Sequence, residues 1–335
     1  MKKTAEYVSI GHPDKIADFI SSKILDYLIE RDEDVKYAVE VMIKDNAVVL
    51  GGEIKTFVNL NDDVLFDLVI NALERIGYDE VYSKRWGDNA INPSKITIIN
   101  LIGKQSNEIN QGVKQDGWGD QGVFVGYACN DIGKINKELR LARTLCHTLY
   151  HKALCSSNLG IDIKTQVTLE KYGKVETVVV AIPMLEDEDL TKIIVEALGE
   201  TPKQIIVNGT GSYKKHSSIA DCGVTGRKLA CDFYSTACPI GGGSPWTKDP
   251  SKADLTLNIY ARHLAMQHLK DNDECFVYLS SCIGKAELMS AVVVTRDWTG
   301  DDIKEIEIKE TPAQIIAKLG LKHPVYAKLC MVGLL

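Results

Sequence analysis

The stretch Gly11-His12-Pro13-Asp14-Lys15 places a histidine, a carboxylate and an ammonium group within five residues. Pro13 suits the first position of a helix, because its fixed φ fits the helix and its missing N–H would be unpaired there anyway. Proline also biases His12 toward an extended backbone, so we expect His12 just outside the mouth of the helix. The free N–H groups of a helix N-terminus favour an anion such as phosphate, and Asp14 beside that anion suits a bridging divalent cation. An ordinary first-turn acid next to a surface histidine is the alternative interpretation.

Further cationic residues suit the neutralisation of a polyphosphate. Positive charge concentrates at Arg227-Lys228 and in the segment Lys248–Asp254, which follows the glycine run Gly241–Gly243. A glycine-rich turn lets backbone N–H groups approach phosphate, and positioned lysine, arginine and metal neutralise its charge. Asp254, like Asp14, begins an expected helix. The two carboxylates could hold one Mg²⁺, or they could be ordinary helix-start acids; a solvated surface is the alternative for each cationic stretch.

Two glycine-rich motifs do not have the context that their letters suggest. Gly117-x-Gly119-x-x-Gly122 matches the dinucleotide-binding fingerprint, but an expected strand follows it where that fingerprint requires a helix. The run Gly241–Gly243 precedes Lys248, but a Walker A motif would need glycine at Thr247. We therefore expect neither a Rossmann dinucleotide site nor a P-loop.

The composition argues against several classes of protein. The chain has 335 residues, a net charge of −7 and nine cysteines. An acidic chain argues against a broad nucleic-acid or anionic-membrane surface, so we expect neither partner. An odd number of cysteines without a Cys-x-x-Cys pair argues for a reducing cytosol over a disulfide framework. With no signal-peptide pattern and no run of about 20 apolar residues, we expect a cytoplasmic protein.

Helical and strand periods alternate along the chain, and the strands tend to come in adjacent pairs. We expect helices over 14–30, 62–77, 134–156, 186–198, 253–269 and 312–319, and strands over 35–43, 46–55, 95–103, 123–128, 165–172, 175–183, 204–208, 274–282 and 288–296. Three strand pairs have hairpin-length connections or lie close in sequence. The fold class is therefore α+β, built of three similar α+β units. The long polar stretches 105–122 and 208–226 suggest functional loops.

The motifs together resemble the S-adenosylmethionine synthetase (methionine adenosyltransferase) family over roughly residues 4–326. The resemblance is carried in order by Gly11–Lys15, Gly51–Ile54, Gly103–Ser106, Gly119–Gly122, Asp221–Gly223, Thr225–Lys228, Gly241–Gly243 and Lys248–Lys252. It implies three α+β units about a pseudo-threefold axis, with an N-terminal domain over 1–105, a lid loop over 106–117, a central domain over 118–213 and a C-terminal domain over 214–335. It also implies a homodimer, often paired into a tetramer, with active sites between subunits.

In this family the sulfur of methionine attacks C5′ of ATP and expels the intact triphosphate, which is then hydrolysed to phosphate and pyrophosphate. The sulfur is neutral and needs no general base. The barrier therefore lies in the charge of the leaving group and in the alignment of sulfur with C5′. A cation-rich cradle for triphosphate is the central requirement.

The resemblance assigns roles residue by residue. Its catalytic set is His12, Lys164, Arg227 and Lys248, and its ATP-binding set adds Asp162, Ser212, Tyr213, Asp221, Lys228 and Ser244. Its methionine-binding set is Glu53, Gln105, Asp120, Asp221 and Lys252. It implies Mg²⁺ at Asp14 and Asp254, with two ions per site, and K⁺ at Glu40.

Several positions depart from the family pattern. Ser212 replaces the usual arginine, Lys214-Lys215-His216 replaces a glycine-rich continuation, and Ile240 replaces a histidine. The lid is shorter, and the chain ends soon after Tyr326, before the usual terminal segment. We expect these changes to affect affinity, kinetics or assembly. Two alternatives follow: a non-catalytic nucleotide-binding homologue that partners an active subunit, and a phosphohydrolase that does not need methionine.

Overall fold

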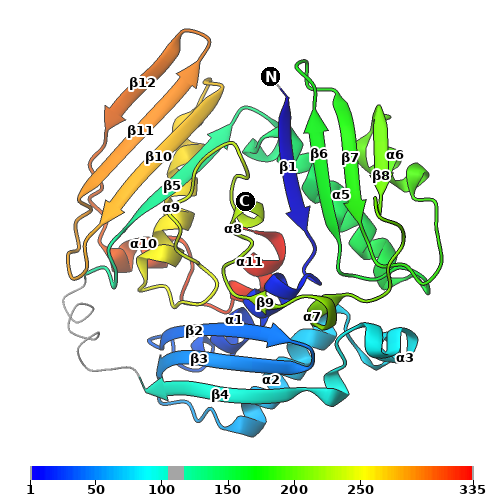
Figure 1. Cartoon of the computed structure of the whole chain (residues 1–335). Coiled ribbons are helices and arrows are strands. Elements are labelled where there is room, and N and C mark those ends of the chain that lie inside the picture. The colour runs from blue at the N-terminus through cyan, green and yellow to red at the C-terminus, as the bar shows by residue number, and fades with distance from the viewer. Residues whose placement is uncertain (1, 105–116, 334–335) are drawn as a thin grey trace.

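The computed structural model of the chain describes residues 2–104 and 117–333. Three four-stranded sheets surround a small group of central helices (Figure 1). The strand orders are β4-β3-β2-β9, β1-β6-β7-β8 and β12-β11-β10-β5. The expected α+β class with three units is confirmed.

The first sheet is built on the hairpin of β2 (Lys36–Lys44) and β3 (Ala47–Lys55). β4 (Thr97–Lys104) runs parallel to β3, and the short β9 (Gly223–Val224) pairs with β2. Alternate residues of β2 are buried beneath α1 (Pro13–Ile29), with α2 (Asp62–Ile76) beside it. The opposite face of β2 is half-buried or exposed, as strand alternation requires when only one face is covered.

The second sheet contains the hairpin of β6 (Lys164–Leu169) and β7 (Val175–Ala181). β1 (Lys3–Val8) pairs with β6, and β8 (Gln204–Val207) runs parallel to β7. The helix α5 (Lys137–Leu154) packs on β1 and β6, and α6 (Thr191–Leu198) packs on α5. Two short helices, α3 (Glu80–Trp86) and α7 (Ser217–Ala220), lie between this unit and the first (Figure 1).

The third sheet pairs β10 (Glu274–Ser281) with β11 (Ser290–Asp297) and β5 (Gly122–Cys129), and β12 (Gly300–Glu305) forms the edge. The helix α9 (Ala253–Leu269) covers this sheet, and α10 (Pro312–Lys318) packs on α9. Gly126 permits close contact with α9, because a Cβ on it would lie 1.9 Å from the carbonyl oxygen of Ala261. α8 (Leu229–Asp232) and α11 (Tyr326–Val332) lie among the three units (Figure 1).

The three expected hairpins and six expected helices are present, and the differences have local causes. The helix expected at 134 begins at Lys137, because Lys134 has a φ of +59° and the backbone of Ile135 and Asn136 is extended. The helix expected at 186 begins at Thr191, after the side chain of Asp189 accepts the N–H of Thr191. The short elements β1, β9, β12, α3, α7, α8 and α11 were not expected, since their lengths carry little periodicity.

Each sheet also takes strands from distant parts of the chain. β1 joins the second sheet, β5 joins the third and β9 joins the first. Each of the three units is therefore built from segments that are discontinuous in sequence. The continuous domain boundaries given above remain a prediction. No helix in residues 2–104 and 117–333 has the length and apolar character needed to cross a membrane.

Candidate active site

His12 lies at the mouth of α1, as its proline neighbour predicts. Its backbone is extended (φ −67°, ψ 140°), Pro13 follows within the first turn, and its Nδ1 accepts the N–H of Asp14 at 3.2 Å. Burial, together with the nearby Lys228 ammonium, lowers the pKa of His12 to about 3. His12 is therefore a neutral imidazole, and its accepting Nδ1 leaves the proton on Nε2, where it can be donated to a ligand.

Asp14 fastens a distant basic segment to α1. One carboxylate oxygen accepts the backbone N–H of Val224 at 2.8 Å, and the other accepts the Lys228 ammonium at 2.5 Å. The Nε of Arg227 lies 3.9 Å from the same carboxylate. Asp14 is almost fully buried, whereas the Arg227 side chain is 56% exposed. The buried acid thus holds the turn while the guanidinium remains available to a ligand.

Asp162, Lys164 and Asp221 complete this assembly. Burial raises the pKa of Asp162 to about 7. Its carboxylate accepts the backbone N–H of Ser217 at 2.8 Å, a hydrogen bond that by itself lowers the pKa. The charges of Lys164, Asp221 and Lys228 act on both Asp162 and His12, so these side chains gather in one region. We call His12, Asp14, Asp162, Lys164, Asp221, Arg227 and Lys228 the α1 group.

A second assembly forms at the start of α9. The Lys248 ammonium pairs with the Asp254 carboxylate, and the Lys252 ammonium lies 3.3 Å from Asp249. Gly243 contacts Asp254 so closely that a Cβ on it would lie 2.0 Å from Oδ1. The N–H of Gly119 donates to the carbonyl of Ser251 at 3.2 Å, which brings the neighbouring Asp120 beside this segment. We call Asp120, Lys248, Lys252 and Asp254 the α9 group.

One edge of β2 aligns the two groups. Beyond β9, the N–H of Thr225 donates to Val41 at 3.0 Å, and further along the strand the N–H of Val39 donates to Thr247 at 2.9 Å. The segments that carry Arg227 and Lys248 therefore follow one another along the same strand. Within residues 2–104 and 117–333, no hydrogen bond or ion pair joins a side chain of the α1 group to one of the α9 group.

The other predicted residues are distributed around β2 and β3. Glu40 lies on the outer face of β2 and accepts the hydroxyl of Thr225, and Glu53 on β3 pairs in register with Ala38. Ser244 lies against Gly226, whose missing Cβ would otherwise be 2.9 Å from the Ser244 Cβ.

The predicted nucleotide-contact residues divide. Tyr213 is half-buried, and the charge of Asp162 acts on its phenol. Ser212 instead donates to Asp187 and lines a separate hollow with Met184 and Val207, so its hydroxyl is engaged away from both groups. Gln105 and most of the predicted lid lie outside the described residues.

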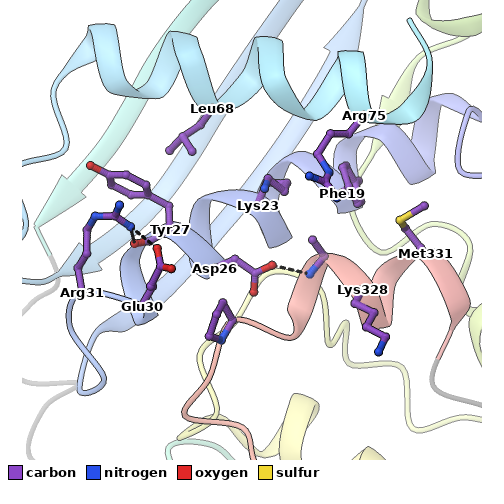
Figure 2. A pocket seen from close by; sticks show the side chains of 12 residues that line it. Phe19, Lys23, Asp26, Tyr27, Glu30, Arg31, Leu68, Arg75, Lys328 and Met331 are labelled. Carbon is purple, nitrogen blue, oxygen red and sulfur yellow. Dashed lines mark hydrogen bonds and ion pairs between the residues drawn. The ribbon is translucent and has the colours of Figure 1, made fainter.

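Asp18 was not predicted. Its carboxylate accepts the N–H of Gly226 at 2.8 Å, and it lies one turn after Asp14 on α1. The signal was available in the i, i+4 spacing of two acids in a helix whose buried residues are mainly apolar. A cavity of about 460 Å³ between α1, α2 and α11 is lined by residues such as Lys23, Asp26 and Arg75 (Figure 2). It contains none of the predicted residues.

The metal ligands fit a substrate-borne Mg²⁺ better than a protein cage. Among the described residues no three His, Cys, Asp or Glu side chains cluster as metal ligands. Asp14 and Asp254 belong to different groups and pair with different lysines. Each offers hard carboxylate oxygens, and Mg²⁺ is commonly bound by one or two carboxylates together with substrate phosphates and water.

Comparisons with known proteins agree with this arrangement. Residues 1–107 match the S-adenosylmethionine synthetase N-terminal domain, and residues 215–335 match the C-terminal domain. The chain is 32% identical to an S-adenosylmethionine synthase of Helicobacter pylori strain G27, over 98% of this chain and 91% of that protein. It is 31% identical to one of Nitratiruptor sp. over the same shares.

The fold comparison extends to the whole chain. An S-adenosylmethionine synthetase of Campylobacter jejuni, described as unusual, superposes with a TM-score of 0.87 at 31% identity and covers 100% of this chain and 94% of its own. Sequence and fold thus agree over nearly the full length. The chain belongs to the S-adenosylmethionine synthetase family.

Proposed function

We propose that the protein is an active methionine adenosyltransferase that forms S-adenosylmethionine from ATP and L-methionine. The sulfur lone pair forms a bond to C5′, the C5′–O bond breaks, and its electron pair leaves on the triphosphate. Hydrolysis of the triphosphate to phosphate and pyrophosphate follows. The observation that carries the proposal is the α1 group, in which a neutral histidine and three cations gather at the mouth of a buried helix.

In this proposal His12 and the cations stabilise the leaving group. The Nε2–H of His12 donates to the departing C5′ oxygen, while Lys164, Arg227 and Lys228 bind phosphate oxygens. Donors fixed before the reaction stabilise charge that develops in the transition state without reorganisation. His12 stays neutral because burial and Lys228 oppose its protonation, so it acts as a hydrogen-bond donor and not as a cation.

The α9 group supplies the remaining roles. Lys248 binds the triphosphate, Lys252 and Asp120 bind methionine, and Asp120 with Asp221 favours the developing sulfonium. Mg²⁺ bound at Asp14 and Asp254 would neutralise phosphate oxygens, and K⁺ at Glu40 would sit beside the Thr225 hydroxyl that this carboxylate accepts. Before substrate binds, the ion pairs Lys228–Asp14 and Lys248–Asp254 hold these lysines and carboxylates in place. The arriving phosphates take the lysines and free the carboxylates for metal.

We propose that two chains share each active site, with the α1 group of one facing the α9 group of the other. The outer face of the first sheet supports this arrangement. It exposes Met42 (42%) on β2, and Ile99 (46%) and Leu101 (64%) on β4, on either side of β3, together with Glu40 and Glu53. Contiguous exposed apolar surface is typical of a protein interface. A homodimer, with a tetramer as a further assembly, would cover it.

The experiment that tests the function is incubation of the purified chain with ATP, methionine, Mg²⁺ and K⁺, followed by quantification of S-adenosylmethionine. We expect one product molecule for each triphosphate hydrolysed. No product at high enzyme concentration would contradict the proposal.

A second candidate rests on the altered nucleotide loop, where Ser212 is turned toward Asp187. It is a non-catalytic homologue that binds nucleotide and partners an active subunit. Such a chain would bind ATP but form product only when mixed with a homologue. A phosphohydrolase would instead release phosphate from ATP at the same rate with and without methionine.

A further inference from the structure

The spacing of two buried acids on α1 matches the spacing of two backbone N–H groups in the segment that precedes Arg227. Asp14 accepts the N–H of Val224 and Asp18 accepts the N–H of Gly226, both at 2.8 Å. Four residues of helix rise about 6 Å, and two residues of extended strand advance about 6.6 Å. The match lets one helix face hold alternate N–H groups of the segment.

The intervening N–H points the other way. Thr225 donates its N–H to Val41 of β2 at 3.0 Å. The segment is therefore held between α1 and β2 like a strand with two partners. Gly226, with a φ of +74° and the side chain of Ser244 against it, then turns the chain, so that Arg227 and Lys228 leave this strand from a fixed point.

A buried network completes the surroundings of Asp18. The Lys15 ammonium lies 3.2 Å from Asp18 and 2.7 Å from Asp232, and the Trp246 indole N–H donates to Asp232 at 2.8 Å. The Lys15 ammonium also lies 4.7 Å from the centre of the Trp246 ring. One cation thus serves two buried carboxylates. Burial raises the pKa of Asp18 to about 7, and its oxygen accepts the Gly226 N–H in either protonation state.

We propose that Asp18 is a positioning residue for the triphosphate cradle, which fixes Arg227 and Lys228 through the backbone of Gly226. The inference rests on the proposed function, because the two cations that Asp18 would position are those proposed to bind the triphosphate. Asp18 does not touch the ligand. Its carboxylate defines where the two cations begin, and a cradle for several phosphate charges depends on such placement.

The test compares three variants by calorimetric binding of inorganic triphosphate with Mg²⁺, without methionine. Asp18→Ala removes the acceptor, and we expect it to weaken binding at least tenfold. Asp18→Asn keeps an oxygen acceptor and should bind within threefold of the unaltered chain. The matched control is Asp26, which lies near the other end of α1 (Figure 2). Like Asp18, it accepts backbone N–H groups, those of Tyr326 and Ala327 at 2.9 and 3.0 Å.

Asp26→Ala should lower thermal stability without changing the affinity for triphosphate. If Asp18→Ala does not fold, Asp18→Ser takes its place, because a hydroxyl keeps a polar atom near Lys15 but falls short of Gly226. A folded Asp18→Ala or Asp18→Ser variant with affinity within twofold of the unaltered chain would overturn the inference. So would an Asp18→Asn variant as weak as Asp18→Ala.

Amide hydrogen exchange separates this inference from the proposed function. We expect Asp18→Ala to speed exchange at Val224 and Gly226, whereas Asp26→Ala should leave both amides unchanged. Unaltered exchange at Gly226 in Asp18→Ala would refute the positioning role, whatever the activity. An unaltered chain that makes no S-adenosylmethionine would refute the proposed function, while the exchange data would still decide the role of Asp18.

Discussion

The α1 group and the α9 group hold their cations in different ways. Lys248 and Lys252 pair with carboxylates three or six residues away in the same segment. Arg227 and Lys228 depend on Asp14, which is more than two hundred residues distant. The first arrangement is local and the second exists only in the folded chain. Mutations that loosen the packing between distant segments should therefore disturb the α1 group before the α9 group.

The comparison also concerns charge. In both groups the resting lysine already has an acidic partner, Lys228 with Asp14 and Lys248 with Asp254. Neither group alone presents the excess of positive charge that a triphosphate requires, although Arg227 remains largely exposed. The proposed cradle needs both groups and metal, and the predictions below test that dependence.

The largest effect is expected for Lys248→Met. Removal of one positioned donor to a developing charge costs about 3 kcal/mol, or about a hundredfold in rate. Initial rates of S-adenosylmethionine formation at saturating substrates measure it. Lys174→Met is the control, because this exposed lysine lies in the turn between β6 and β7, away from both groups. A change below about threefold would place Lys248 outside the cradle.

Mixed dimers test whether the two groups come from different chains. We expect Arg227→Met and Lys248→Met to be nearly inactive when purified alone. When equal amounts are co-expressed, about half of the dimers are mixed, and each mixed dimer contains one site with both groups intact. Activity should then recover to about a quarter of that of the unaltered protein, as expected for shared sites. Activity equal only to the sum of the two variants would indicate that each site is built within one chain.

A substitution on the outer face of the first sheet should reduce activity less, because it acts through the proposed dimer interface. Leu101 is 64% exposed there, and Leu101→Glu would place a charge in the proposed interface at the cost of its desolvation. We expect a shift toward monomer in light scattering and a loss of activity of about tenfold at low protein concentration. Tyr172→Glu is the control, because Tyr172 is also exposed, at 84%, but lies on another unit. A fully active monomer would refute the shared site.

Sequence periodicity predicted much of the fold because the hairpins are local. The connection between β2 and β3 and that between β6 and β7 are a few residues long, and alternation within each strand was visible. β1 could not be predicted with the same means, since its partner β6 lies more than 150 residues away and its own pattern is short. The pairing of β9 with β2 depends on the same kind of distant contact.

The site shows the same division. The helix mouth at His12 followed from one proline, and the structure confirms its geometry. The hydrogen bonds from the N–H groups of Val224 and Gly226 to two acids could not be predicted. Nearly every residue type carries a backbone N–H, so the sequence does not indicate which of them an acid will accept. The roles of Ser212 and Gln105 stay predictions: the first faces Asp187, and the second lies outside the described residues.

The smallest expected effect is a pH dependence that belongs to the α1 group. Burial raises the pKa of Asp162 to about 7, so between about pH 4 and pH 7 the folded chain holds a proton that the unfolded chain has lost. The contribution of this group to stability is therefore present below pH 4 and falls as pH rises toward 7, by at most about 1.4 kcal/mol for each pH unit.

Asp162→Asn removes that titration while keeping an oxygen acceptor for Ser217. We expect the free energy of unfolding of the variant to improve relative to the unaltered chain as pH rises from 5 to 7. Denaturant unfolding at several pH values measures the difference. A constant difference between the Asp162→Asn variant and the unaltered chain would show that Asp162 titrates as an ordinary exposed acid. The α1 group would then be more hydrated than its burial indicates.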